Sequence, residues 1–112
     1  MGHGQSDVTV VITYQAQPGR GDVARDELAA LIAVVVELEP DCRGIRLLQG
    51  TADADQFLLI EEWSSEAAFT GPHMTTPHLQ AFMGRAREFL AGPPEIRFWR
   101  GVVEVPSGAS TM

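Results

Sequence analysis

Four segments of the chain carry the hydrophobic and β-branched residues that are typical of β-strands. They are separated by glycine, proline or small polar residues, and they cover residues 8–15, 44–49, 56–63 and 96–105. Two other segments repeat hydrophobic residues every three or four positions, which is the period of one face of a helix. These predicted helices cover residues 23–38 and 77–90, and a shorter helix is expected between Ser64 and Gly71.

Residues that cap or break helices mark the ends of these predicted helices. Asp22 and Ser64 are suited to cap the first helix and the short helix, because their side-chain oxygens can accept hydrogen bonds from free backbone N–H groups. Thr76 is a third capping candidate, and Pro77 follows it at the first helical position, where proline is favoured. Pro40 predicts the end of the first long helix.

The order of the predicted elements is strand, helix, strand, strand, helix, strand. This order is the split βαβ arrangement of the ferredoxin-like fold, an α+β fold. It predicts one antiparallel sheet with the helices on one of its faces. We expect a single domain over residues 8–105, with flexible tails at residues 1–7 and 106–112.

Hydrophobic residues occur on both faces of the predicted sheet. In the third strand Phe57 and Leu59 point to one side while Leu58 and Ile60 point to the other. A sheet with one exposed face should instead alternate hydrophobic with polar residues. The helices cover only one face, and so we expect a second copy of the chain to pack on the other, giving a homodimer with sheet-to-sheet contact.

Composition excludes several classes of function. The 112 residues carry a net charge of −7, and all eight basic residues are arginines. The missing lysine excludes Schiff-base chemistry, and the acidic balance argues against nucleic-acid binding. Cys42 is the only cysteine and cannot form an internal disulfide. No run of residues is apolar enough to cross a membrane and no signal-peptide pattern opens the chain, so we expect a cytoplasmic protein.

Three motifs resemble the antibiotic biosynthesis monooxygenase (ABM) domain family, at residues 39–44, 61–69 and 73–82. Their order and spacing match that family over about residues 8–100. The resemblance implies a dimeric α+β barrel with a pocket between the helices and the sheet of each subunit. Several members oxygenate aromatic polyketide or quinol-type substrates with molecular oxygen and use neither metal nor flavin. Others degrade heme, isomerise small metabolites or have no established activity.

His73 and His78 are the candidate catalytic residues. A histidine titrates near neutral pH and can take a proton from a phenol or an anthrone carbon. A structural or surface role is the alternative for each. They are five positions apart, and we expect no Asp or Glu to cluster with them. This is poor spacing for a metal site, and we expect neither a metal nor another cofactor.

Aromatic and methionine side chains are the candidate substrate-binding residues, because they suit a flat hydrophobic ligand. Each also suits the core or its edge. Trp63 matches a tryptophan that the resemblance places at the end of the third strand. The full set is Tyr14, Trp63, Phe69, Met74, Phe82 and Met83.

The chain departs from the family at the positions where relatives carry asparagine. Some oxygenating members have one in the third strand, where this chain has Leu59, and the heme-degrading members need one in the first strand. The heme ligand of those relatives falls near Met83. Heme degradation is therefore disfavoured. Arg46 is expected to pair across the sheet with Glu61 or Glu62.

The leading functional hypothesis is a cofactor-independent monooxygenase acting on an aromatic small molecule. A non-oxidative isomerase or cyclase-like enzyme on the same scaffold is the first alternative. A protein that binds a small molecule without turnover is the second, because one fold supports many functions.

Overall fold

A computed structural model describes residues 7–108 of the chain. The predicted tails fall largely on residues 1–6 and 109–112, which lie outside the described residues. The elements are β1 (Val8–Gln15), α1 (Gly21–Leu38), β2 (Cys42–Gln49), β3 (Gln56–Trp63), α2 (Glu66–Thr70), the 3₁₀ turn η2 (Pro72–Thr75), α3 (Pro77–Arg85), the 3₁₀ turn η3 (Ala86–Glu88) and β4 (Glu95–Trp99).

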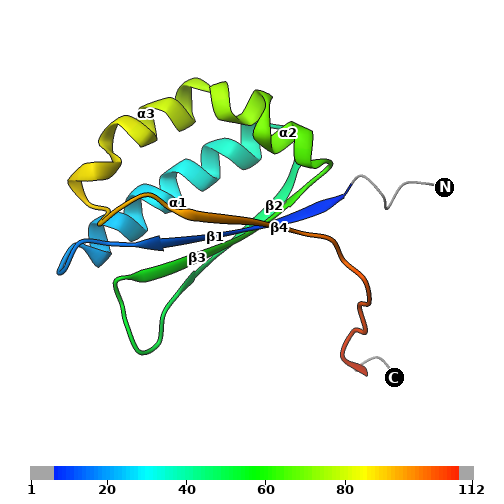
Figure 1. Ribbon diagram of the computed structural model, residues 1–112, viewed down its shortest axis with the longest axis horizontal. Coiled ribbons are helices and arrows are strands. Elements are labelled where there is room, and N and C mark those ends of the chain that lie inside the picture. The colour runs from blue at the N-terminus through cyan, green and yellow to red at the C-terminus, as the bar shows by residue number, and fades with distance from the viewer. Residues whose placement is uncertain (1–6, 109–112) are drawn as a thin grey trace.

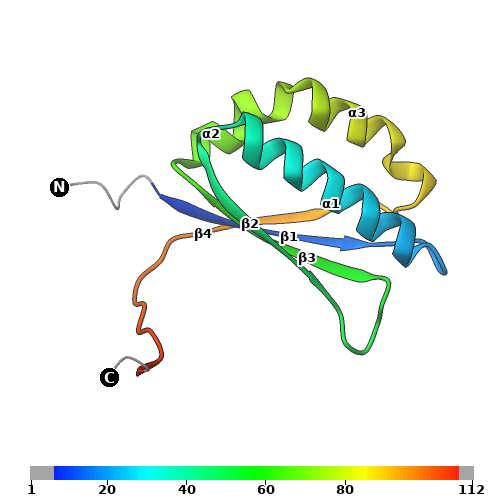
Figure 2. The same cartoon turned by 180° about the vertical axis from the view of Figure 1, so that it is seen from behind.

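The four strands form one antiparallel sheet in the order β2-β3-β1-β4. All the helices lie on the same face of this sheet (Figure 1), and the view from behind shows no helix on the other face (Figure 2). The sheet order and the helix placement confirm the α+β ferredoxin-like prediction. The core lies between the two layers.

The core is built from alternate residues of the two central strands and the inner stripe of α1. Val10 and Ile12 of β1 point inward together with Leu59 and Trp63 of β3, and all four are buried. Leu28 of α1 packs onto them and is fully buried. Burial of these side chains is the main source of stability, at about 25 cal/mol for each Å² of apolar surface removed from water.

Truncation of the α1 core residue tests this packing. We expect Leu28→Ala to lower the free energy of unfolding by about 2–5 kcal/mol, because it removes buried methyl groups and leaves a cavity. Leu38→Ala is the matched control on the same helix. Leu38 is 61% exposed, so this change should stay within about 0.5 kcal/mol. Urea denaturation measures both, and equal losses would contradict the described packing.

Two of the predicted helix caps are wrong. α1 begins at Gly21, so Asp22 lies inside its first turn, and the residue before the helix makes no side-chain cap bond. The cap of α2 is Ser65, whose hydroxyl accepts from the N–H of Ala68. Ser64 instead donates its hydroxyl to Asp41 at 2.6 Å. The predicted cap of α3 is confirmed, because the Thr76 hydroxyl accepts from the N–H of Leu79.

The second predicted long helix and the last predicted strand are both shorter than expected. α3 stops at Arg85 and tightens into η3, before Gly92. β4 stops at Trp99, which pairs with Thr9 near the start of β1. A strand needs a neighbour to receive its hydrogen bonds, and the neighbouring strand begins only at Val8. The chain beyond residue 99 therefore leaves the sheet without regular pairing.

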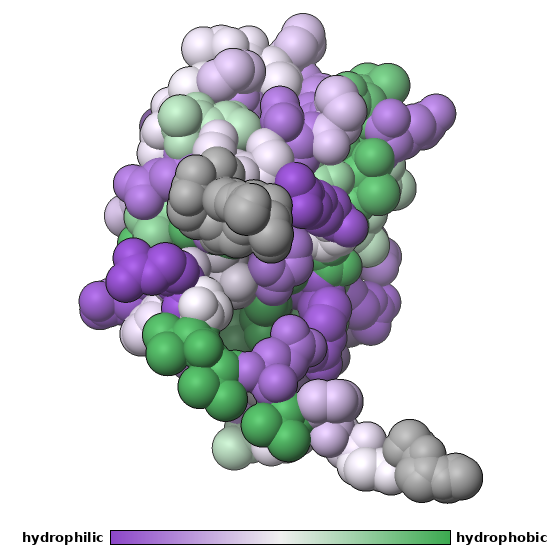
Figure 3. Space-filling model, turned by 90° about the vertical axis from the view of Figure 1, so that its right-hand side faces the viewer, coloured by the Kyte–Doolittle hydropathy of each residue, from purple (hydrophilic) through white to green (hydrophobic). Residues whose placement is uncertain are grey.

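The outer face of the sheet and the segment after it carry uncovered hydrophobic residues. Val11, Leu58 and Ile60 lie half-buried on the face that no helix covers. After Trp99 the chain runs away from the helices (Figure 1), and Val102 and nearby valines are 80–85% exposed. Figure 3 shows hydrophobic side chains standing out at the lower end of the molecule. Among the described residues, no helix has the length and apolar character to cross a membrane.

Candidate functional site

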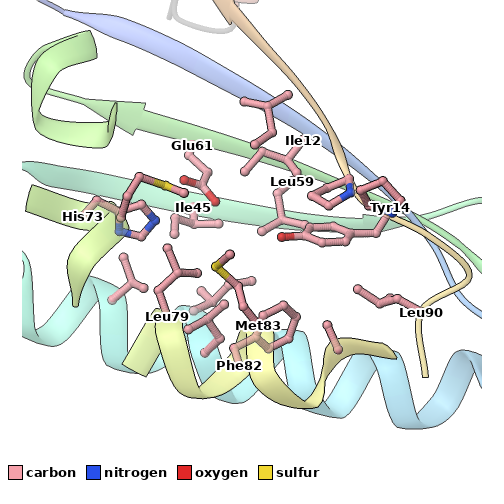
Figure 4. A pocket seen from close by; sticks show the side chains of 18 of the residues that line it. Ile12, Tyr14, Ile45, Leu59, Glu61, His73, Leu79, Phe82, Met83 and Leu90 are labelled. Atoms are coloured by element: carbon pink, nitrogen blue, oxygen red, sulfur yellow. The ribbon is translucent and has the colours of Figure 1, made fainter. Parts of the chain in front are cut away.

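A cavity of about 640 Å³ lies between the inner face of the sheet and the helices. Its size is within the range of small-molecule sites. Most of its wall is hydrophobic and comes from α1, α3 and the inner faces of the strands (Figure 4). The hydrophobic wall includes Ile12, Leu31, Ile32, Val35, Ile45, Leu59, Phe69, Met74, Leu79, Phe82 and Met83.

Three side chains with acid–base chemistry face this hydrophobic space. They are Tyr14 from β1, Glu61 from β3 and His73 from η2. In Figure 4 the Tyr14 hydroxyl points along the cavity toward the end where Glu61 and His73 lie. A few convergent polar groups in a largely apolar cavity are typical of a ligand or active site.

His73 is held by the carboxylate of Glu39. The Nδ1 atom of His73 lies 2.9 Å and 3.0 Å from the two carboxylate oxygens of Glu39. The Nε2 atom of His78 lies 2.5 Å from one of the same oxygens. All three side chains are largely buried. The expectation that no carboxylate accompanies the histidines is therefore wrong, because Glu39 is distant from them only in sequence.

The chain folds locally so that one carboxylate meets two rings. Glu39 follows the last residue of α1, where its backbone N–H still bonds to the carbonyl of Val35. η2 carries His73, and the Thr76 cap starts α3 so that His78 falls in its first turn. The Thr76 hydroxyl also donates to the backbone carbonyl of His73, which fixes the turn between the two histidines.

The hydrogen bonds to Glu39 determine which nitrogen of His73 is free. An ionised carboxylate only accepts hydrogen bonds, so Nδ1 of His73 and Nε2 of His78 are the donors. The Nε2 atom of His73 is then the nitrogen that can accept a proton. A carboxylate that fixes the tautomer and orientation of a histidine is a recurring feature of catalytic sites.

Glu61 is the second acid–base group of the cavity. Its side chain is 4% exposed, and its Oε1 atom accepts a hydrogen bond of 2.9 Å from the indole Nε1–H of Trp63. Burial raises the pKa of Glu61 from its ordinary value of 4.5 to about 7. The Trp63 hydrogen bond works in the opposite direction, while the charge of Glu39 adds to the increase in the pKa.

Aromatic rings pack against His73 and Tyr14. The ring centre of His73 lies 4.7 Å from that of Trp63 and 4.9 Å from that of Phe69. Tyr14 meets Phe82 edge to face with ring centres 6.3 Å apart. Burial raises the pKa of the Tyr14 hydroxyl above its ordinary value, and the charge of Glu61 raises it further. Tyr14 is therefore a hydrogen-bond donor in the neutral pH range.

The structure brings most of the sequence-predicted site residues to one cavity. His73, Tyr14, Phe69, Met74, Phe82 and Met83 line it. Trp63 and His78 are not lining residues; Trp63 supports His73 and Glu61, and His78 binds Glu39. Within residues 7–108 no group of three or more His, Cys, Asp or Glu side chains is arranged to hold a metal ion.

Sequence reasoning missed Glu39 and Glu61. The expected ion pair of Arg46 with Glu61 or Glu62 is wrong: Arg46 lies opposite Ile60, and Glu61 points to the cavity face. Glu62 lies on the other face and accepts a hydrogen bond from Thr9. The alternation of β3 was a usable signal, because it places Glu61 on the same face as its buried neighbours two residues away on either side.

The chain is similar to known proteins in both sequence and structure. The model of the family described as "Antibiotic biosynthesis monooxygenase" matches residues 7–85. The uncharacterized protein sll1783 of Synechocystis sp. is 28% identical over 79 residues, which is 68% of this chain and 53% of that protein. The chain thus spans about half the length of this curated relative.

Solved structures share the whole fold. PA3566 from Pseudomonas aeruginosa is 28% identical, with a TM-score of 0.79 over 91% of this chain and 100% of that chain. A protein from Caulobacter crescentus CB15, whose name carries the same family description, is 24% identical. Its TM-score is 0.78 over 90% of this chain and 94% of its own. At that identity the second similarity shows the fold alone.

Proposed function

The chain belongs to the antibiotic biosynthesis monooxygenase family, and from this premise we propose that it is a cofactor-independent monooxygenase of aromatic small molecules. The substrate is of the polyketide or quinol type and binds in the cavity between the sheet and the helices. The observation that carries the proposal is the His73–Glu39 pair at the end of that hydrophobic cavity.

The reaction needs the protein to remove one proton and to stabilise the anion that results. An anthrone or quinol becomes electron-rich once deprotonated and can then transfer an electron to oxygen. For an anthrone, a CH₂ group becomes a carbonyl, the second oxygen atom leaves as water, and the substrate supplies all four electrons. Nε2 of His73 is the base, and Glu39 stabilises the imidazolium ion that forms.

The cavity wall supplies substrate binding. Phe69 and Phe82 offer flat surfaces to an aromatic ring, and Met74 and Met83 adapt to its outline. His78 acts through Glu39, whose position it fixes from the other side. Trp63 packs against His73 and restricts the orientation of the ring. The hydrophobic wall also keeps water from the anion.

Oxygen consumption with a panel of anthrones and quinols tests the proposal. We expect the wild-type protein to consume oxygen faster than the double variant His73→Ala, His78→Ala, with the quinone and water as products. Glu37→Ala is the control, because Glu37 is an exposed residue of α1 outside the cavity. Equal rates for the wild type and the double variant would remove this mechanism.

A non-oxidative isomerase is the second candidate, and one observation favours it. The cavity pairs a base, His73, with a second acid–base group, Glu61, and moving a proton within a substrate needs no oxygen. Product formation from a carbonyl compound under strict anaerobiosis would identify this activity. A protein that only binds would be expected to turn its histidines to solvent, whereas His73 is buried at the cavity.

We further propose that a second copy of the chain covers the outer face of the sheet. Light scattering coupled to size exclusion should give a dimer at micromolar concentration. Leu58→Arg, on the uncovered face of the inner strand β3, should give a monomer. Val36→Arg is the matched control on the exposed side of α1 and should leave the dimer intact. A monomeric wild-type protein would contradict the proposal.

A further inference from the structure

We propose that Glu61 is a second catalytic residue and acts as an acid, donating a hydrogen bond or its proton to a substrate oxygen while His73 removes a proton. The substrate class that fits this pair is an un-ionised aryl ketone that can form an enol. This inference rests on the proton transfer of the proposed function. It adds the group that stabilises the negative charge developing on the substrate oxygen.

The geometry leaves one oxygen of Glu61 available to a ligand. Oε1 accepts the indole hydrogen bond of Trp63. Among residues 7–108 Oε2 makes no hydrogen bond, and the side chain faces the cavity next to Ile45 (Figure 4). A buried carboxyl group that is held on one oxygen and open on the other is suited to present an O–H to a bound molecule.

Glu61 and His73 are close enough to act on one substrate. Trp63 contacts both: its Nε1 lies 2.9 Å from Glu61, and its ring centre lies 4.7 Å from that of His73. Both side chains line the same cavity. The Tyr14 hydroxyl points toward them and offers a second donor to the same substrate oxygen (Figure 4).

The surroundings favour the un-ionised acid. Glu61 lies in a hydrophobic wall near the negative charge of Glu39, and Arg87, an exposed residue, is the one arginine that lines the cavity. Burial raises the pKa of Glu61 to about 7, so the acid form dominates below neutral pH. The titratable groups that face or influence Glu61 from the elements around it are Tyr14 on β1, Glu39 after α1, Cys42 on β2, His73 on η2 and, through Glu39, His78 on α3.

The proposed step balances without an oxidant. Nε2 of His73 takes a proton from the substrate carbon, and the electron pair of that C–H bond moves through the conjugated ring to the carbonyl oxygen. Glu61 gives its proton to that oxygen. The products are the enol, an imidazolium ion on His73 and a carboxylate on Glu61. Proton exchange with solvent restores both side chains, and no atom changes its oxidation state overall.

Hydrogen–deuterium exchange on anthrone in D₂O under anaerobic conditions measures this step directly. We expect Glu61→Gln to keep the exchange rate within about 10-fold of the wild type at pH 6, because its amide still donates a hydrogen bond. We expect the wild-type exchange rate to decline above pH 7, where Glu61 loses its proton. This decline should be absent in Glu61→Gln. Glu61→Leu should be about 100-fold slower at every pH, because it lacks a donor.

Glu62→Gln is the matched control on the outer face of the same strand and should behave as wild type. Trp63 fluorescence, read in a Trp99→Phe background, provides a readout that needs no turnover. It should titrate with a midpoint near pH 7 and lose that transition in Glu61→Gln.

Two outcomes overturn the inference. If Glu61→Gln exchanges as slowly as Glu61→Leu and the wild-type rate rises rather than falls as the pH passes 7, Glu61 acts as a base and not as a donor. If both variants exchange at the wild-type rate, Glu61 has no catalytic role. The assay uses no oxygen, so exchange without oxygen uptake would reject the monooxygenase proposal and leave this inference standing.

Discussion

Replacing Glu39 by glutamine is expected to lower kcat by roughly 10²- to 10⁴-fold with little change in KM. The carboxylate accepts hydrogen bonds from His73 and His78 at the same time. A neutral amide cannot stabilise the imidazolium ion that forms on His73, and its nitrogen replaces one of the two oxygens that Nδ1 of His73 contacts. Where the amide nitrogen faces Nδ1 of His73, the proton moves to Nε2, and that nitrogen can no longer act as the base.

Glu37→Gln is the matched control for this prediction. Glu37 is an exposed residue in the last turn of α1, just before Glu39. Its replacement should leave kcat unchanged. Steady-state kinetics with the best substrate of the anthrone and quinol panel measures the effect, and circular dichroism checks that both variants fold. An active Glu39→Gln variant would show that Glu39 serves packing and not the orientation of His73.

The free energy of unfolding is expected to fall by about 3 kcal/mol between pH 4.5 and pH 7 through Glu61 alone. The pKa of this side chain is about 7 in the folded protein, against an ordinary value of 4.5. Below pH 4.5 both states hold the proton and the stability is unaffected. As the pH rises, the unfolded chain releases the proton first, so unfolding becomes more favourable until the folded state also ionises near pH 7.

Urea denaturation at a series of pH values checks this sign. Glu61→Gln should remove the decline, because an amide does not titrate, while Glu62→Gln on the exposed face should keep it. If the free energy of unfolding of Glu61→Gln still falls with pH, other groups cause the decline. The same carboxyl group is thus expected to link stability to the protonation state that we propose for catalysis.

Much of the fold could be predicted from the sequence because local residue patterns determine its elements. The β-branched runs and the helical repeats gave the element order, and the order implies the sheet. The end of β4 could not be found in this way. Residues 100–105 have strand-like composition, but β1 offers no partner beyond Thr9 and Val8. Strand length depends on a neighbour that lies about 90 residues away in the sequence.

The candidate site was predictable only in part, because it also depends on contacts between residues that are distant in the sequence. Side-chain type singled out His73 and the aromatic wall. Glu39 lies 34 positions from His73, and the two meet because α1 packs against α3, which follows η2 directly. Glu61 could have been found from strand alternation, since a carboxylate between two buried residues on the inner face must lie in the core or in a cavity.

The polar end of the cavity and much of its hydrophobic wall come from different segments of the chain, so evolution can change one without the other. The acid–base groups come from β1, β3, η2, the end of α1 and His78 in the first turn of α3, whereas the rest of α3 contributes Leu79, Phe82 and Met83. Met83 is half exposed and bears little of the core. Substitutions in α3 beyond His78 can therefore reshape the cavity for a new ligand while the proton-transfer groups keep their hydrogen bonds. One scaffold can in this way give rise to a series of enzymes that share chemistry and differ in substrate.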